Sequence, residues 1–303
     1  MKYLPEENTL NIPEDFEQAF YKDPFLTTDL TATVMLKTKG IIDKTDIKII
    51  YYIYDTKFCT KGQLVRWANY VGIEEDELWD RLDVMLKNTI INKFGLVDEE
   101  KYKGALPDDA KMFFCLHDGG KNLLDNFSGE DFIDWQAGYN VTHPKNVLKS
   151  LISAELYTQF FTSESPLLFH ERRPLYTLKM DRFFGGDVFS VLKNGETHYY
   201  VCDIFLSSDK TNTVRNKLRN YENVFCSQIW KRYYKDCGFN PHLIFITDDD
   251  SAAAVLASEV SNFRFNDFLI STKDRVLSGV NTQGSFLKLN KDMNQLELTS
   301  LGV

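Results

Sequence analysis

The segment Asp187-Val188-Phe189-Ser190-Val191-Leu192-Lys193-Asn194-Gly195-Glu196-Thr197-His198-Tyr199-Tyr200-Val201-Cys202-Asp203 decides the fold of the second half of the chain. Two runs rich in β-branched and aromatic residues flank Asn194-Gly195. This dipeptide is the strongest short signal for a tight turn between antiparallel strands. The segment therefore predicts a β-hairpin with strands over residues 187–192 and 197–206.

Helix and strand patterns continue on both sides of this hairpin. A helix is expected over residues 144–161 and a strand over 175–181, which ends at Asp181. After the hairpin we expect a helix from Thr211 to about Asp236, a continuously apolar strand over 242–247, a helix over 248–261 and a last strand over 265–271. The order helix, three strands, helix, strand, helix, strand predicts an α/β domain over residues 140–303.

The first half of the chain gives a different pattern. Residues 1–40 predict an irregular arm with one short helix over 14–20. Helices are expected over 46–54, over 61–71 with Thr60 as its cap, and over 74–86; strands are expected over 90–94 and 111–116, and another helix opens at Gly119. Three helices followed by a two-stranded ribbon predict a winged helix-turn-helix over residues 41–130, so the whole chain is expected to be α+β.

Composition limits the protein's class. The chain has 303 residues and is 43% hydrophobic, enough for two packed domains. Its five cysteines are scattered and form no C-x-x-C pair, so neither a disulfide framework nor a structural zinc site is expected. No apolar run approaches the ~20 residues of a membrane helix, and the N-terminus lacks a signal-peptide core. A cytoplasmic protein without a membrane partner is therefore expected.

The formal charge of −9 is unevenly distributed. Residues 1–150 hold 18 Lys/Arg and 26 Asp/Glu, whereas residues 151–303 hold 17 and 18. Affinity for DNA comes largely from neutralising phosphates, so this balance argues against nucleic acid without excluding local basic patches.

Carboxylates in the second half suggest metal chemistry. A metal-dependent nuclease needs two or three carboxylates converging on Mg²⁺ and a lysine near the attacking water. The candidate metal ligands are Glu171, Asp181 and Asp203, with Glu155 on the preceding helix, and Asp181 and Asp203 are also the candidate catalytic acids. Phe205 stands two residues after Asp203, where the lysine is expected. Lys210 or Lys217 would have to replace it, and Lys217 is our catalytic candidate.

These elements and residues resemble the PD-(D/E)xK restriction-nuclease fold and, more specifically, the replication-relaxation proteins of plasmids and mobile elements. The resemblance covers roughly residues 45–250. It is carried by the wing-to-helix segment 114–124, His143, Glu171 in segment 169–174, Asp181, the strand 199–205 and the helix segment 215–221. It implies a winged helix joined to a nuclease-like domain. The chain departs from the family pattern at Met180-Asp181, where the family has Pro-Asp. It also departs at Asp203, a single acidic residue where the family has two alternating acidic residues on the strand.

Several basic residues are candidates for contacts with DNA phosphates, although each could instead lie on an ordinary solvated face. The expected recognition helix is rich in acids between Glu74 and Asp83, which would repel phosphates, so we place the DNA contacts elsewhere. The candidate residues are Lys61, Arg66, Lys93, Lys111, Arg172, Arg173, Arg215, Lys217 and Arg219.

Three hypotheses follow from the sequence. The first is a DNA-binding accessory protein of a plasmid or mobile element, acting in replication or its control, with a nuclease-like domain that has lost catalysis. The second is an active Mg²⁺-dependent endonuclease, and the third is a protein-interaction scaffold that uses the acidic winged helix. Of these hypotheses, enzymatic activity is less favoured than a binding function. A homodimer is also open, because winged-helix proteins often dimerise, although no heptad run specifies one.

Overall fold

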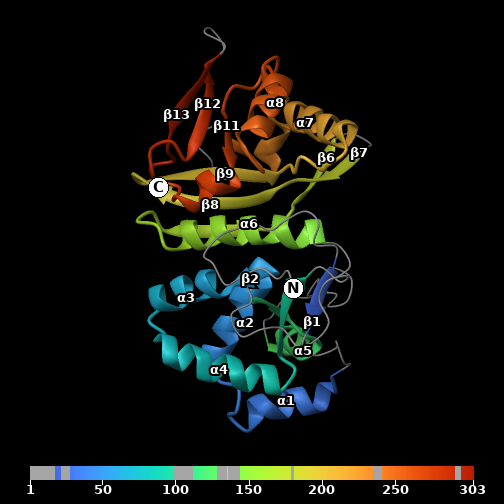
Figure 1. Cartoon of the computed structure of the whole chain (residues 1–303), viewed down its shortest axis with the longest axis vertical. Coiled ribbons are helices and arrows are strands. Elements are labelled where there is room, and N and C mark those ends of the chain that lie inside the picture. Colours follow the sequence, from blue (N-terminus) through green and yellow to red (C-terminus); the bar gives the residue numbers. More distant parts are fainter. Residues whose placement is uncertain are drawn as a thin grey trace. The chain divides into compact units, whose positions relative to one another are not determined.

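The computed structural model describes residues 18–21, 28–97, 112–127, 135, 144–178, 181–234, 241–290 and 295–303. It is a mixed α/β structure of two compact units, residues 1–154 and 155–303 (Figure 1). The division between the units falls within helix α6 (Pro144–Phe161). No helix in the described ranges combines the length and apolar character needed to cross a bilayer.

The helices of unit 1 begin where local capping chemistry starts them. Asp43 and Asp46 form a reciprocal capping box at the start of α2 (Lys44–Thr56). Thr60 and Gln63 do the same for α3 (Lys61–Tyr70), with the Gln63 amide donating to Thr60 Oγ1 at 3.2 Å. Such caps accept hydrogen bonds from backbone N–H groups that have no partner within the first helical turn. The predicted helices are therefore confirmed, including α4 (Glu75–Lys87).

The two strands expected after α4 are also confirmed. Strand β3 (Ile91–Val97) pairs antiparallel with β4 (Phe113–Leu116), with Ile91 opposite Leu116. The short β2 (Cys59–Thr60) joins β4, and helix α5 (Asp118–Phe127) follows it. Edge-to-face contact between Phe58 and Phe94, whose centroids are 5.5 Å apart, fills the space beneath this sheet.

The prediction of an irregular N-terminal arm was wrong in two places. Residues Gln18–Tyr21 form strand β1, which pairs with β3, although they fall in the expected helix over 14–20; residues 14–17 lie outside the described ranges. Pairing with a neighbouring strand overrides local preference here. Helix α1 (Leu30–Thr38) was missed, although Asp29 caps it. Its Thr and Val residues have weak helix propensity, so the sequence does not clearly indicate a helix here.

Unit 2 is built on a seven-stranded mixed sheet. The predicted hairpin is confirmed, since Asn194 and Gly195 have φ of 53° and 80°, as a turn between twisted antiparallel strands requires. The strand order is β13-β12-β11-β10-β9-β8-β5. The strands are β5 (Leu167–Glu171), β8 (Asp187–Lys193), β9 (Glu196–Ile204), β10 (His242–Thr247), β11 (Phe268–Thr272), β12 (Phe286–Asn290) and β13 (Gln295–Thr299).

The faces of this sheet are covered by helices. Helices α7 (Thr211–Cys226) and α8 (Asp250–Val260) pack on one face, where Leu218 and Tyr221 meet Val201 and Phe245 in one buried cluster (Figure 1). On the opposite face, Phe160 of α6 stacks on Phe189 of β8 with centroids 4.7 Å apart. Strand β10 runs parallel to both β9 and β11 and is buried on both faces, as its apolar run predicts.

Three element assignments in unit 2 need correction. The first strand of the main sheet is β5, whereas segment 175–181 contributes β6 (Leu175–Leu178), which pairs with β7 (Asp181–Phe184) in a separate two-stranded sheet. Helix α7 ends at Cys226 rather than near Asp236, because Gln228 takes a left-handed conformation ahead of a short 3₁₀ helix. Strand β11 is not the last, since α9 (Lys273–Leu277), β12 and β13 follow.

Strand β5 forms one edge of the large sheet and is irregular. Its pairing with β8 shifts register between Leu167 and Phe169. Leu168 and Phe169 are consecutive, yet both are exposed, at 52% and 45%. In a regular strand, neighbouring side chains point to opposite faces of the sheet. The register shift interrupts this alternation in the edge strand β5.

We predict that Thr60→Ala lowers the free energy of unfolding by about 1 kcal/mol, because the first turn of α3 loses its hydroxyl acceptor. Thr60→Ser should keep most of the stability, since it retains the hydroxyl. Urea denaturation followed by circular dichroism measures both changes. Equal losses in the two variants would show that the threonine methyl group, rather than the cap, matters.

Candidate functional site

Asp203 lies near the end of strand β9 and is only 6% exposed. Its Oδ2 accepts from Lys217 Nζ at 2.6 Å and from Tyr221 Oη at 2.6 Å, and its Oδ1 accepts from the Ile204 amide at 2.9 Å. The structure therefore brings together the predicted pair Asp203 and Lys217. A buried carboxylate is tolerated only when it is paired and hydrogen-bonded, and all three contacts serve that purpose.

Tyr221 extends this arrangement to the next strand. Burial, followed by the nearby Asp203 charge, raises the pKa of Tyr221 well above its usual value, so the phenol keeps its proton. The hydroxyl donates to Asp203 and accepts from the Gly186 amide at 2.5 Å. A Cβ atom at Gly186 would collide with the carbonyl of Cys202, so only glycine permits this close approach of β8 to β9.

A second buried carboxylate, Asp187, was missed by the sequence analysis. It begins β8 opposite Cys202 and is 6% exposed. Its Oδ1 accepts from the Arg173 amide at 3.2 Å, and its Oδ2 lies 3.9 Å from His170 Nε2 and 4.0 Å from Arg172 Nε. The signal for it was its place at the start of a strand after Gly185-Gly186. Its importance depends on contacts with β5 and the turn after it, which the residues next to Asp187 in the sequence do not indicate.

The two buried carboxylates lie on opposite faces of the sheet. Asp187 shares a face with its cross-strand partner Cys202, and side chains alternate along a strand, so Asp203 points the other way. The contacts agree, because Asp203 meets helix α7 whereas Asp187 meets residues of β5 and the turn after it. Asp187 and Asp203 therefore do not converge on one point.

The remaining predicted metal ligands lie on three other elements. Asp181 begins β7 in the separate two-stranded sheet instead of ending a strand of the main sheet, and only its backbone is described. Glu171 is the last residue of β5 rather than preceding the strands; burial raises its pKa and His170 lowers it. Glu155 is buried on α6 and accepts from Gln159 Nε2 at 2.7 Å.

The described residues do not fit a Mg²⁺ ion. Among them, no group of three His, Cys, Asp or Glu side chains is placed to hold a metal. Asp203 Oδ2 already contacts an ammonium and a phenol, so a cation there would have to displace Lys217. We therefore derive no metal-dependent step from this arrangement.

The basic residues predicted on α7 point in different directions. Arg215 forms a bidentate pair with Glu259 of α8, at 2.8 and 2.6 Å, while Lys217 turns inward to Asp203. Arg219 is exposed. Arg172 approaches Asp187, and Arg173 lies 5.5 Å from the ring centroid of Phe184. These residues do not form one continuous basic face.

Unit 1 does bring two predicted cations together. Lys61, at the start of α3, and Lys93, on β3, line one hollow of about 230 Å³ together with Trp79, Phe114 and the acidic Asp83. Lys61 Nζ lies 4.9 Å from the Trp79 ring centroid. Arg66 lies on α3 and is half-buried, whereas Lys111 falls outside the described ranges.

Comparisons with known proteins give little further guidance. No family model matches the chain, and no curated protein matches it. A crystal structure of protein VC1899 from Vibrio cholerae is similar at 10% identity and a TM-score of 0.29, over 87% of this chain. The chain spans 57% of that protein. A similarity at this level supports no inference about fold or function.

We predict that Lys217→Met lowers the free energy of unfolding by about 2 kcal/mol, because it leaves the Asp203 charge buried without its ammonium partner. Arg215→Met, two residues away on the same helix, is the matched control and should change stability much less, since its ion pair is exposed. Urea denaturation at neutral pH measures both. Equal effects would show that Lys217 does not neutralise Asp203.

Proposed function

We propose that the protein is a DNA-binding accessory protein of a plasmid or mobile element, acting in replication or its control, and that its nuclease-like domain is catalytically silent. The observation that carries the proposal is the arrangement around β9. Strands β5, β8, β9 and β10 are adjacent in that order, and Asp203 on the third of them is paired with Lys217 from the following helix. This order is the one expected of a PD-(D/E)xK domain, with a displaced lysine.

The same arrangement supports the loss of catalysis. Hydrolysis of DNA by this chemistry requires carboxylates that share one metal ion. Asp203 is neutralised by Lys217, and Asp187, the acid that begins the second strand, lies on the opposite face. The pairing that makes Asp203 stable in the interior also removes it from metal binding.

The elements of unit 1 support the DNA-binding part of the proposal. Helices α2, α3 and α4 are followed by the antiparallel strands β3 and β4, as a winged helix requires. Lys61 and Lys93 come from the start of α3 and from the first wing strand, and they lie at the same hollow. Two ammonium groups at this position can contact backbone phosphates, whereas the acidic α4 is unsuited to enter the groove.

The proposal is tested by titrating supercoiled plasmid with the full chain on agarose gels, with and without Mg²⁺, at low and moderate salt. Retarded but intact plasmid in both conditions is the expected result. Nicked or linear plasmid that appears only with Mg²⁺ would overturn the silent-domain reading. It would favour the alternative, a Mg²⁺-dependent endonuclease, and cleavage should then be lost in Asp203→Asn.

For the DNA contacts, we predict that the double variant Lys61→Gln and Lys93→Gln weakens binding and reduces the slope of log affinity against log salt by about 2, because each phosphate contact releases about one counterion. The control is Lys44→Gln with Lys48→Gln, which makes the same charge change at two exposed lysines of α2. Fluorescence anisotropy with a labelled duplex measures both slopes. Identical slopes in the two double variants would exclude Lys61 and Lys93 as phosphate contacts.

A second candidate function is favoured by the surface of α4. Glu74, Asp76, Asp80 and Asp83 are exposed along this helix, and such a surface complements a basic protein better than a nucleic acid. Plasmid that neither shifts nor breaks at low salt would favour this protein-interaction scaffold over DNA binding.

A further inference from the structure

A pocket of about 330 Å³ opens at the carboxyl ends of the parallel strands β9 and β10, and none of the functions above uses it. It lies between the start of α7 and the length of α8, the helices that follow these two strands. Ligands of open α/β sheets commonly bind at this edge, where the chain leaves parallel strands and enters helices. Its volume suits a small molecule rather than a segment of a macromolecule.

The floor and one wall of the pocket are apolar. Phe205 and Leu206 come from the chain that leaves β9, Val214 from α7, and Val255 and Leu256 from α8. Val255 is 65% exposed, although a helix of this kind normally turns such a residue inward. An apolar ligand body would cover this exposed surface and gain the corresponding burial energy.

The polar part of the pocket is acidic. The described residues that line it carry three carboxylates and one guanidinium: Asp209, Asp249, Glu259 and Arg215. Arg215 is already engaged by Glu259 in the bidentate pair between α7 and α8. Asp209 Oδ2 accepts from the Leu206 amide at 2.9 Å, which orients this carboxylate, and the described lining residues together carry a formal excess of negative charge.

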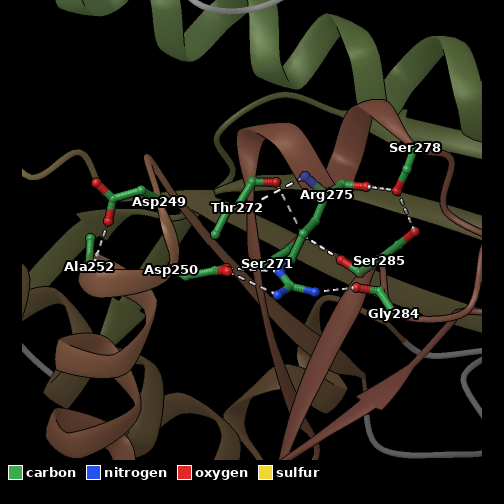
Figure 2. Close-up of polar contacts among 9 residues, drawn as sticks. All are labelled: Asp249, Asp250, Ala252, Ser271, Thr272, Arg275, Ser278, Gly284 and Ser285. Atoms are coloured by element: carbon green, nitrogen blue, oxygen red, sulfur yellow. Dashed lines mark hydrogen bonds and ion pairs between the residues drawn. The ribbon is translucent and has the colours of Figure 1, made fainter.

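The acidic wall is held in place before any ligand arrives. Asp249 caps α8 by accepting from the Ala252 amide at 2.8 Å, while the adjacent Asp250 turns to Arg275, as Figure 2 shows. Arg275 binds both oxygens of Asp250, at 2.9 and 3.1 Å, and donates to the Gly284 carbonyl at 2.7 Å. Ser271 Oγ also donates to the Ser285 carbonyl at 2.6 Å, which ties β11 to the start of β12 (Figure 2). A preorganised wall lowers the cost of binding.

We propose that this pocket binds a small amphiphilic amine, with its apolar body on Phe205, Val214 and Leu256 and its protonated amine near Asp209 and Asp249. Such a ligand matches both the apolar floor and the excess negative charge. The starts of α7 and α8 both act in the opposite direction, since a helix N-terminus favours anions; Asp249 caps α8, whereas Lys210 gives α7 no side-chain cap. The two carboxylates outweigh these partial charges, so the pocket selects a cation.

The test is isothermal titration calorimetry of the full chain with three probes that share an indole ring. Tryptamine carries an amine, tryptophol a neutral hydroxyl, and indole-3-propionate a carboxylate. Tryptamine should bind about fivefold more tightly than tryptophol, because its charge meets a partly exposed acidic wall, and indole-3-propionate should bind most weakly. Absence of binding by all three, or binding of the carboxylate at least as tight as that of the amine, would overturn the proposal.

Two variants assign the binding to this pocket. Asp249→Asn keeps a residue that can cap α8 but removes the charge, so it should weaken tryptamine and leave tryptophol nearly unchanged. Ala252→Phe fills the pocket from the partly exposed start of α8 and should abolish binding of both. Glu196→Gln, an exposed acid in the β8–β9 hairpin, is the charge-matched control and should change neither. Tryptamine binding that persists in Ala252→Phe would place the amine elsewhere on the protein.

Discussion

The buried carboxylate of Asp203 imposes the strongest constraint on unit 2. A charge taken out of water destabilises the fold unless opposite charge and hydrogen bonds surround it. Lys217 supplies the charge and Tyr221 a hydrogen bond, and both come from α7. Tyr221 also accepts from Gly186 at the approach to β8, so one acidic side chain fixes the position of a helix against two strands. The packing of Leu218 against Phe245 and the other core residues then follows from that position.

The same constraint supports the proposal that unit 2 has a nuclease-like plan without nuclease chemistry. In a metal site, the protein leaves some carboxylate oxygens without hydrogen-bond partners, so that these oxygens can bind the cation. Here the protein itself supplies partners for Asp203, and a side chain at position 186 would collide with the Cys202 carbonyl. In the proposed function, the ion pair between Lys217 and Asp203 stabilises a scaffold whose role is binding.

Local signals predicted many of the elements, because each depended on chemistry written into neighbouring residues. Thr60 with Gln63, and Asn194 with Gly195, specify a helix start and a turn almost independently of the rest of the chain. Strand β1 could not be predicted in this way, since only pairing with the distant β3 makes it a strand. Lys210 and Lys217 were both candidates to approach Asp203, because their helix follows its strand, and the structure brings Lys217 to it. Asp187 was missed because its importance depends on β5, a strand whose exposed residues gave no clear alternation.

The irregular edge at β5 has a consequence for the behaviour of the protein in concentrated solution. An uninterrupted edge strand offers a row of free amide and carbonyl groups that can template the addition of another chain. The shift of register between Leu167 and Phe169 breaks that row near the start of the strand, beside two exposed apolar side chains, Leu168 and Phe169. The irregularity therefore makes this edge a poor nucleus for cross-β growth, so the apolar surface can remain exposed with less risk of aggregation.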